Sequence, residues 1–171
     1  MEGDERRGVE GRRRRRAPTR PVNAEAQRRR DAEDGEGEAE RPAGVMTLNE
    51  ITGIVVDAAI EVHRVLGGPG LLERVYEEAL ICELQLRGLR VDRQTPIELT
   101  YKGYRLASDL RLDMLVEQDV IVECKASAAH HPVFEAQALT YLRLSGLKVA
   151  LVINFGVPLV KDGIHRVVNN V

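Results

Sequence analysis

Three charged residues have the types and spacing of a hydrolytic metal site: Asp113, Glu123 and Lys125. They lie in residues 113–125, where two apolar runs are joined by a short polar stretch, a pattern typical of a β-hairpin. Because side chains alternate across a strand, Glu123 and Lys125 share one face and their immediate neighbours point to the other. The presence of two charged residues beside an apolar strand needs an explanation, and a catalytic or metal-binding role is one.

The length of the turn decides whether the two carboxylates meet. A three-residue turn over 117–119 places Asp113 across from Glu123, with Cβ atoms roughly 5 Å apart. A two-residue turn over 118–119 would place Asp113 opposite Cys124, on the wrong face of the hairpin, since a one-residue slip moves every side chain to the other side. The hypothesis of a shared site therefore requires the odd-length turn.

Two carboxylates this close repel each other at neutral pH unless a proton or a cation lies between them. Mg²⁺ or Mn²⁺ is the natural occupant, because carboxylate and water oxygens suit hard cations that also meet substrate phosphates. Lys125 would then position or deprotonate an attacking water, or stabilise developing negative charge. The alternative is that Glu123 and Lys125 form a solvated hairpin edge and Asp113 is a surface charge, and spacing alone leaves both interpretations open.

Residues 1–45 differ in composition from the rest of the 171-residue chain. They hold 12 Arg and 11 Asp or Glu, with no aromatic residue and no Leu or Ile. Such a segment cannot bury enough apolar surface to offset its ordering entropy. We therefore expect a disordered Arg/Glu-rich tail over 1–45, most simply a solvated extension, and one domain over 46–171.

Charge and hydropathy narrow the class of protein. Residues 46–171 carry 13 Lys or Arg against 16 Asp or Glu, which argues against broad binding of nucleic acid by a basic surface. No run approaches the roughly 20 apolar residues of a membrane span, and no apolar stretch follows the N-terminal arginines, so we expect a cytoplasmic protein. Cys82 and Cys124 indicate neither a disulfide framework nor a zinc site, and both are expected to be buried.

Apolar periodicity predicts two helices at the start of the domain, over 48–66 and 71–87. Thr47 and Glu50 have the spacing of a capping box for the first helix. The Gly/Pro sequence at 67–70 ends it, so the two helices should pack as neighbours.

Extended segments and one further helix follow. A third helix is expected to begin at Pro132 and end at Gly146. The almost wholly apolar segment 147–154 is typical of a strand covered on both faces. The other expected strands are 91–93, 97–102, 104–116 and 120–125. This α-α-β-β-β-α-β order predicts an α/β fold with a mixed β-sheet flanked by helices.

Several short motifs together resemble those of a known family. Residues 70–76, Gly-Leu-Leu-Glu-Arg-Val-Tyr, fit the Gly-x-x-Glu-x-x-Tyr pattern of the GxxExxY protein family, a prokaryotic branch similar to the PD-(D/E)xK nuclease superfamily. The 113–125 hairpin, residues 135–137 with Tyr141, and Asn154-Phe155-Gly156 also look like segments of that family. The resemblance covers essentially Leu48 to Val171 and none of the tail.

The resemblance implies a restriction-endonuclease-like core in which Asp113, Glu123 and Lys125 fill the acidic, acidic and lysine positions of the superfamily motif. Glu73 would match a helix carboxylate that assists metal binding. Two positions depart from the usual pattern: the 67–70 turn carries an extra glycine, and Leu112 stands where the superfamily has proline.

Other candidate residues have plausible structural explanations. The resemblance matches Gln137 and Tyr141 to a Gln-x-x-x-Tyr helix that would hold substrate or brace the site, whereas the alternative is a core tyrosine whose hydroxyl is satisfied by the amide. Glu73 shares a helix face with Tyr76, which points its carboxylate toward the core side, although a first-turn acid is also favoured by the helix dipole.

Histidines give no clear metal signal in the sequence. His63 borders an apolar helix stripe and is expected to be packed and hydrogen-bonded. His130 and His131 are adjacent and should point apart, so a loop at the start of a helix is the simpler interpretation.

The sequence thus predicts a metal-dependent nuclease that uses Mg²⁺ or Mn²⁺ on DNA or RNA. A nuclease fold that only binds or regulates, without turnover, is the alternative. A homodimer formed by apolar helix faces is a further alternative, and fold-level resemblance does not by itself establish activity.

Overall fold

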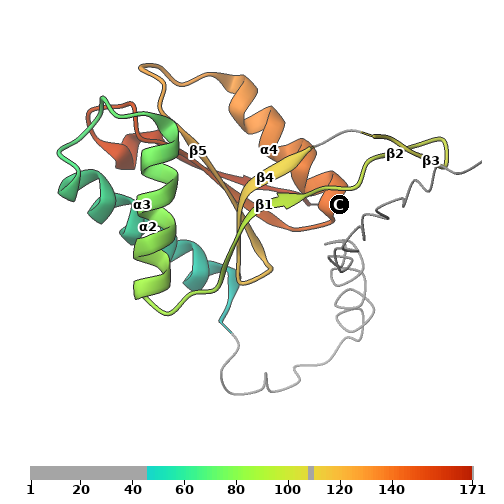
Figure 1. Ribbon diagram of the computed structural model, residues 1–171, viewed down its shortest axis with the longest axis horizontal. Coiled ribbons are helices and arrows are strands. Elements are labelled where there is room, and N and C mark those ends of the chain that lie inside the picture. The colour runs from blue at the N-terminus through green and yellow to red at the C-terminus, as the bar shows by residue number, and fades with distance from the viewer. Residues whose placement is uncertain (1–45, 108–109, 171) are drawn as a thin grey trace, which may run out of the picture.

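The computed structural model describes residues 46–107 and 110–170, so the predicted tail over 1–45 lies outside the described residues. The elements in chain order are α2 (Leu48–Val65), α3 (Glu73–Leu86), β1 (Val91–Pro96), β2 (Thr100–Tyr101), β3 (Tyr104–Arg105), β4 (Arg111–Val116), β5 (Val120–Lys125), α4 (Pro132–Ser145), β6 (Val149–Asn154), the 3₁₀ helix η1 (Val160–Gly163) and β7 (Ile164–Val168) (Figure 1). None of the helices in these two ranges is long and apolar enough to cross a membrane.

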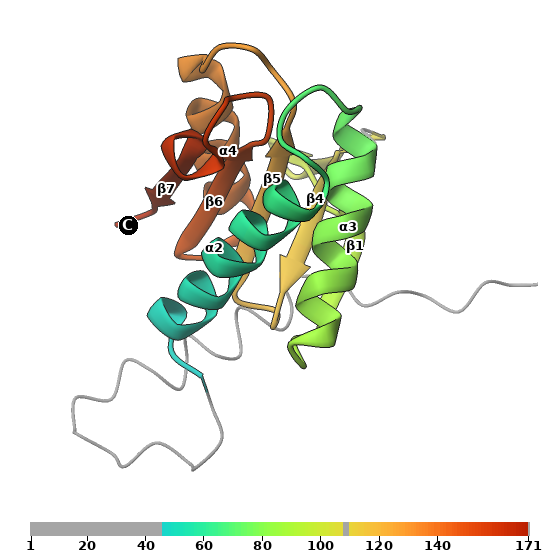
Figure 2. The same ribbon diagram turned by 90° about the vertical axis from the view of Figure 1, so that its left-hand side faces the viewer.

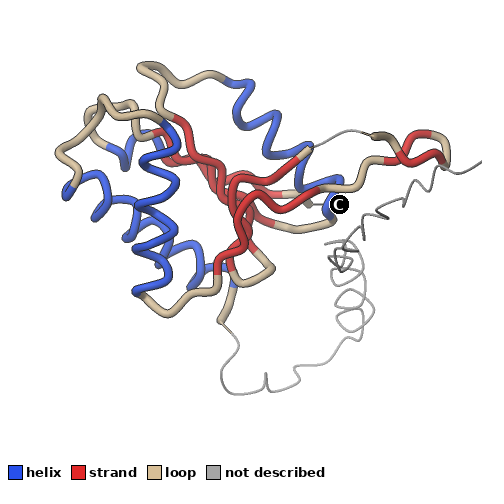
Figure 3. Tube along the Cα trace, viewed as in Figure 1, coloured by secondary structure: helices blue, strands red, loops and turns tan. Residues whose placement is uncertain are grey.

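Five strands form one mixed sheet in the order β1-β4-β5-β6-β7. β5 and β6 are parallel and the other neighbours are antiparallel. α4 supplies the crossover between the two parallel strands, as a parallel connection requires. Helices α2 and α3 cover one face of the sheet and α4 covers the other (Figures 2 and 3). This arrangement confirms the predicted α/β class, a mixed sheet flanked by helices.

The helix boundaries follow from local signals that the sequence carries. The capping box of α2 is present, since Glu50 N donates to Thr47 Oγ1 (3.1 Å) and Thr47 N donates to the Glu50 carboxylate (2.6 Å). Pro132 is the first residue of α4, and Gly146, with φ of +77°, ends that helix in a left-handed conformation. These ends are the ones predicted.

Several details of the fold differ from the sequence expectations. The predicted strands 97–102 and 104–116 are not continuous. In their place are the hairpin β2–β3, whose two strands have two residues each and which extends away from the body of the sheet (Figure 1), and the shorter strand β4. Strand β7 was not predicted, because it is short and mixes polar with apolar residues. Cys82 is exposed rather than buried, whereas Cys124 is buried as expected.

The two faces of the sheet form separate hydrophobic clusters. One lies under α2 and α3 and contains Val55, Leu80 and Val122 among others. The other lies under α4 and contains Leu142 and Val152 among others. All six residues of β6 are buried, as predicted for a strand covered on both sides.

The end of β6 is tied to the chain that leaves β5. Phe155 N donates to Lys125 O (2.7 Å). The buried Asn154 side chain bonds the next segment twice: its Oδ1 accepts from Ser127 N (3.0 Å), and its Nδ2 donates to Ser127 O (2.9 Å). Asn154 Oδ1 also accepts from Gly156 N (3.0 Å). These bonds fix the backbone on both sides of Lys125 and Ala126.

This close approach predicts that Gly156→Ala destabilises the protein. A Cβ at Gly156 would lie 2.6 Å from both the backbone N and C of Ser127, so backbone must move, which typically costs about 1–3 kcal/mol. Gly53→Ala in α2 is the matched control: a Cβ there meets no atom within 4 Å, and alanine should stabilise the helix by up to about 1 kcal/mol. Denaturant unfolding measures both free energies, and two changes of equal sign and size would contradict this account.

Candidate active site

The hairpin of β4 and β5 has the register that the carboxylate hypothesis needs. Val116 pairs with Val120 and Met114 with Val122, so the turn is the three-residue segment 117–119. Two non-glycine residues of the turn, Glu117 and Gln118, have positive φ angles of 51° and 63°. Of the two turn lengths that the sequence left open, the structure has the odd-length one that the carboxylate hypothesis requires.

Contacts with the segment that enters β1 hold this strained turn. Glu117 N donates to Arg90 O (2.9 Å), and Arg90 N donates to Glu117 Oε1 (2.6 Å). Gln118 Nε2 donates to the Asp92 carboxylate. Because the turn is bonded to a third strand segment, its length and the hairpin register are fixed together.

The backbone hydrogen-bond ladder between β4 and β5 ends at the pair Met114 and Val122. Beyond this pair, side-chain carboxylates accept the hydrogen bonds that backbone carbonyls would otherwise accept. Asp113 N donates to Glu123 Oε1 (3.3 Å), and Cys124 N donates to Asp113 Oδ2 (3.1 Å). Each carboxylate therefore accepts a strand N–H that would otherwise face the neighbouring strand. This exchange holds Asp113 and Glu123 beside each other at the end of the sheet.

The alternation of β4 side chains between the two faces of the sheet is interrupted at Asp113. Leu112 and Leu115 both belong to the cluster under α4 although they are three residues apart. On the other side of β4, the register with β1 skips Gln94, whose φ is +49°. Asp113 is thus the position where β4 leaves regular pairing with both neighbours, which frees its side chain from the sheet pattern.

The Lys125 amine lies between the two carboxylates. Its Nζ is 3.5 Å from Glu123 Oε2 and 3.8 Å from Asp113 Oδ2, and the side chain is 14% exposed. Burial opposes the charged form, but the carboxylates of Glu123, Asp113 and Glu73 outweigh it and raise the pKa of Lys125. Lys125 is therefore a cation at neutral pH, which favours electrostatic and positioning roles over that of a base.

Glu123 is the most perturbed group of the site. It is 2% exposed, and burial, followed by repulsion from Asp113, raises its pKa to about 8 although Lys125 acts in the opposite direction. At pH 7 the Glu123 carboxyl therefore retains a proton. The two carboxylates were expected to need either a proton or a cation between them, and here a proton fulfils that requirement. A dication would have to displace this proton.

Glu73 lies farther out than the helix-face argument indicated. It is the first residue of α3 and is exposed, so the expectation that its carboxylate points toward the core is wrong. The oxygens of Glu73, Asp113 and Glu123 do not all lie within 4.8 Å of one another among the described residues. Its charge nevertheless acts on Lys125, which places it at the periphery of the site.

Tyr76 explains why the Gly-x-x-Glu-x-x-Tyr segment has its shape. The buried Tyr76 hydroxyl donates to Gly68 O (2.7 Å) and accepts from Leu71 N (3.2 Å). Its ring stacks on Phe155, with centroids 4.7 Å apart and planes 5° apart. The motif tyrosine thus holds the glycine turn against the end of β6, and this sets where Glu73 begins α3.

Gln137 and Tyr141 form a pair on α4. Gln137 Nε2 donates to the Tyr141 hydroxyl (2.6 Å), and Tyr141 belongs to the cluster under α4. This is the contact expected from the core-tyrosine alternative. One helical turn earlier, the ring of Phe134 lies 6.0 Å from Lys125 Nζ, so α4 reaches the candidate site through Phe134, a residue that the sequence did not single out for this role.

Histidines behave partly as expected. His63 is buried and its Nε2 lies 3.2 Å from Val157 O, as predicted for a packed residue. His130 and His131 lie in the predicted loop at the start of α4, and both rings contact Phe134 edge to face. His130 also meets His165 of β7 and Glu135 of α4. The sequence missed this cluster because His165 lies on a strand that was not predicted.

Comparison with known protein families agrees with this geometry. A family model described as the PD-(D/E)XK nuclease superfamily matches residues 49–167. The chain belongs to the PD-(D/E)XK nuclease superfamily. Members of this superfamily generally use divalent metal ions. Searches of curated proteins and of solved structures gave no significant match.

The perturbed pKa of Glu123 predicts a pH-dependent stability. Because its folded pKa of about 8 exceeds the ordinary glutamate value of 4.5, the native state binds more protons between these values, and the free energy of unfolding falls as pH rises through them. Glu123→Gln removes this loss. In the presence of chelator, the variant should gain stability relative to the original chain from pH 5 to pH 9, at about 1.4 kcal/mol per unit of pKa shift.

Denaturant unfolding at pH 5, 7 and 9 measures the difference. Glu78→Gln, which removes a largely exposed carboxylate of α3, is the matched control and should show a much smaller trend. A Glu123→Gln difference that stays constant over this range would mean that Glu123 does not retain its proton in the folded chain.

Proposed function

We propose that this protein is a metal-dependent nuclease that hydrolyses phosphodiester bonds of nucleic acid, with Mg²⁺ or Mn²⁺ held by Asp113 and Glu123. The observation that carries the proposal is the meeting of these two carboxylates with Lys125 where the β4–β5 ladder ends, in a chain of this superfamily. The donor set fits a hard dication, because both ligands are carboxylates and one holds a proton that such an ion would replace.

Each residue has a distinct part in this proposal. Asp113 and Glu123 bind the ion, which when present supplies Lewis-acid stabilisation and a more acidic water. Lys125, as a buried cation, orients the attacking water and stabilises charge that develops on the phosphate oxygens. Glu73 lies outside the carboxylate pair, where its charge acts on the Lys125 amine and would assist the pair in holding the ion.

The helix α4 braces the site in this proposal. Phe134 lies against Lys125, and the Gln137–Tyr141 hydrogen bond stiffens the same helix one and two turns further on. Contact of Gln137 or Tyr141 with the substrate backbone is the finer form of this proposal. The Gly-x-x-Glu-x-x-Tyr segment, whose tyrosine orders the start of α3, supports placing the chain in the GxxExxY branch.

The β2–β3 hairpin supports nucleic acid as the substrate class. Tyr101 and Tyr104 are 60% and 76% exposed, and Lys102 Nζ lies 5.5 Å from the centroid of the Tyr101 ring. Exposed aromatic rings beside cations are the groups on which unpaired bases stack. The net negative charge of the domain means that such local contacts, with the ion, must supply most of the attraction.

Loss of the amine should abolish cleavage without removing the ion. The full chain is incubated with labelled single- and double-stranded DNA and RNA, with and without Mn²⁺. Lys125→Ala should lower the rate by about 10²–10³-fold or more and retain Mn²⁺ binding, whereas Asp113→Ala should lose both. The control is Lys161→Ala, which changes an exposed residue of η1 and should cleave normally. Undiminished cleavage by Lys125→Ala would overturn the mechanism, and absence of both cleavage and Mn²⁺ binding in the original chain would favour a non-catalytic binding module.

Binding of Mn²⁺ should release a proton. Because the pKa of Glu123 is raised to about 8, the apparent affinity should rise up to about tenfold per pH unit below that value and level off above it. Calorimetric titrations at pH 6.5, 7.5 and 8.5, each in two buffers of different ionisation enthalpy, measure both quantities. An affinity that does not change with pH would show that the ion does not displace the Glu123 proton.

A further inference from the structure

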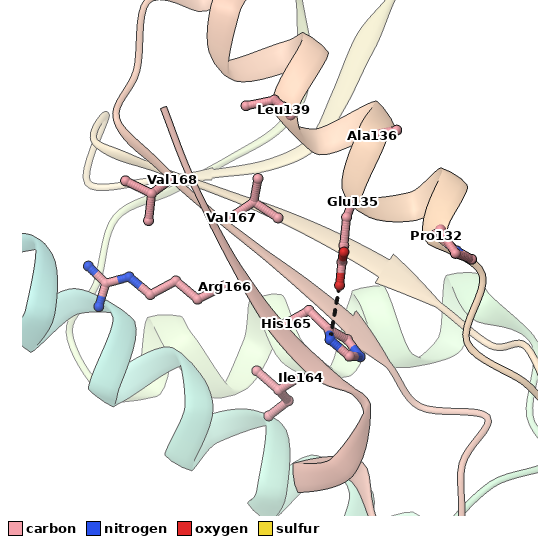
Figure 4. Close-up of a pocket in the computed structure, with 9 residues that line it drawn as sticks. All are labelled: Pro132, Glu135, Ala136, Leu139, Ile164, His165, Arg166, Val167 and Val168. Carbon is pink, nitrogen blue, oxygen red and sulfur yellow. Dashed lines mark ion pairs between the residues drawn. The ribbon is translucent and has the colours of Figure 1, made fainter. Parts of the chain in front are cut away.

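Three side chains from separate parts of the chain meet beside the start of α4. His130 comes from the loop before the helix, Glu135 from its first turn and His165 from β7. Glu135 Oε1 lies 3.4 Å from His130 Nε2 and 3.1 Å from His165 Nδ1, and Figure 4 shows Glu135 and His165 pointing at each other. Within residues 46–107 and 110–170, this is the one group of three His, Cys, Asp or Glu residues whose ligand atoms all lie within 4.8 Å of one another.

We propose that His130, Glu135 and His165 bind a divalent transition-metal ion, for which Zn²⁺ fits best. Two imidazole nitrogens and one carboxylate oxygen form a donor set that suits Zn²⁺ and is poorly suited to Mg²⁺. Around a tetrahedral Zn²⁺ with bonds of about 2.0–2.1 Å, neighbouring donor atoms lie about 3.3–3.4 Å apart. The two separations from Glu135 Oε1, 3.1 Å to His165 Nδ1 and 3.4 Å to His130 Nε2, are close to this value.

Hydrogen bonding leaves one buried nitrogen of each imidazole without a partner among the described residues. His130 and His165 stack with ring centroids 3.9 Å apart, and both direct one nitrogen at the same carboxylate oxygen. Their other nitrogens, His130 Nδ1 and His165 Nε2, are buried and have no hydrogen-bond partner among the described residues. Buried polar atoms are nearly always satisfied, so two imidazoles with an unpartnered nitrogen in one cluster are unusual. The nitrogens placed to bind an ion together with Glu135 are the opposite ones, His130 Nε2 and His165 Nδ1, which both face Glu135 Oε1.

A pocket next to the cluster leaves room for a solvent ligand. It has a volume of about 590 Å³ and is lined by α4 and β7, including Glu135, Leu139 and His165 (Figure 4). Three protein ligands with one open position are typical of a Zn²⁺ ion that also binds water. The ion would join the first turn of α4 to β7, which otherwise pairs with β6 at the edge of the sheet.

This second site is distinct from the carboxylate site but lies close to it. Glu123, Val152 and His165 occupy one row across the sheet, so Glu123 and His165 are two strand spacings apart, about 10 Å. The Phe134 ring lies between the sites: it contacts His130 edge to face, with centroids 6.2 Å apart, and lies near Lys125 Nζ. A bound ion would therefore order the helix turn that carries Phe134 without sharing a ligand with Asp113 or Glu123.

The test uses the untagged full chain after removal of metal with a chelator. Zn²⁺ is titrated calorimetrically, and Co²⁺ serves as a spectroscopic probe because its visible absorption reports four-coordinate geometry. The proposal expects one ion per chain at this site, a four-coordinate Co²⁺ spectrum and no displacement by excess Mg²⁺. His165→Ala and Glu135→Gln should each weaken Zn²⁺ binding by about a hundredfold or more.

Two controls separate this site from others. His131→Ala removes the neighbouring histidine, which packs on Phe134 outside the cluster, and should leave binding unchanged. Asp113→Ala should also leave Zn²⁺ binding at this site intact, so failure of the nuclease proposal would not affect it. Thermal unfolding in chelator shows whether each variant folds, and Zn²⁺ should raise the melting temperature of the original chain and of His131→Ala but not of Glu135→Gln.

Several results would overturn the proposal. One such result is the absence of saturable Zn²⁺ binding by the original chain. Another is Zn²⁺ binding by both His165→Ala and Glu135→Gln that is as strong as that of the original chain. Loss of the site in His131→Ala with retention in Glu135→Gln would equally exclude the cluster.

Discussion

The candidate active site depends on one local exchange of hydrogen bonds. Where the β4–β5 ladder ends, the backbone N–H groups of Asp113 and Cys124 donate to the carboxylates of Glu123 and Asp113 rather than to backbone carbonyls. The strands lose regular pairing there, but two acidic side chains become fixed beside each other in a buried position. Repulsion and burial together raise the pKa of Glu123, and the Lys125 amine partly compensates. A site prepared in this way has a strong electrostatic preference for an additional positive charge.

Much of the surrounding sequence pattern supports this exchange rather than taking part in chemistry. Asn154 and Phe155 bond the backbone that follows β5, and Gly156 permits the close approach of Ser127. Tyr76 stacks on Phe155 and bonds the glycine turn before α3. The Asn154 amide and the rings of Phe155 and Tyr76 therefore form a continuous packed contact from the glycine turn to the backbone that follows Lys125. A motif that resembles a family signature can thus owe its residues to positioning, and a functional role for each must be argued separately.

The sequence predicted the parts of the fold that local physics decides. The ends of α2 and α4 follow from a capping box, an N-terminal proline and a C-terminal glycine. Strand alternation showed which turn length would bring Asp113 opposite Glu123, but contacts of the turn with the segment before β1, far away in the sequence, go with the length that is observed. Strand β7 was missed because its pairing with β6 is non-local and its residues lack alternation. The exposure of Glu73 was missed because helix spacing shows which residues are neighbours but not how deep they lie. The His130–Glu135–His165 cluster could not be found from spacing, since β7 brings its third member from 30 residues away in the chain.

The charge state of Lys125 limits the chemistry that the site can perform. A lysine that acts as a base must be neutral near pH 7, and burial alone would move its pKa in that direction. Here burial is outweighed by the neighbouring acidic groups, and the pKa of Lys125 is raised. Binding of a dication by Asp113 and Glu123 would displace the Glu123 proton and compensate the charge of Asp113, so the ion and the amine are coupled through shared partners. Glu73, which lies outside the pair, would then be the carboxylate that continues to favour the cation. If Asp113 and Glu123 bind an ion as proposed, the peripheral position of Glu73 would leave its charge available to favour the protonated form of Lys125.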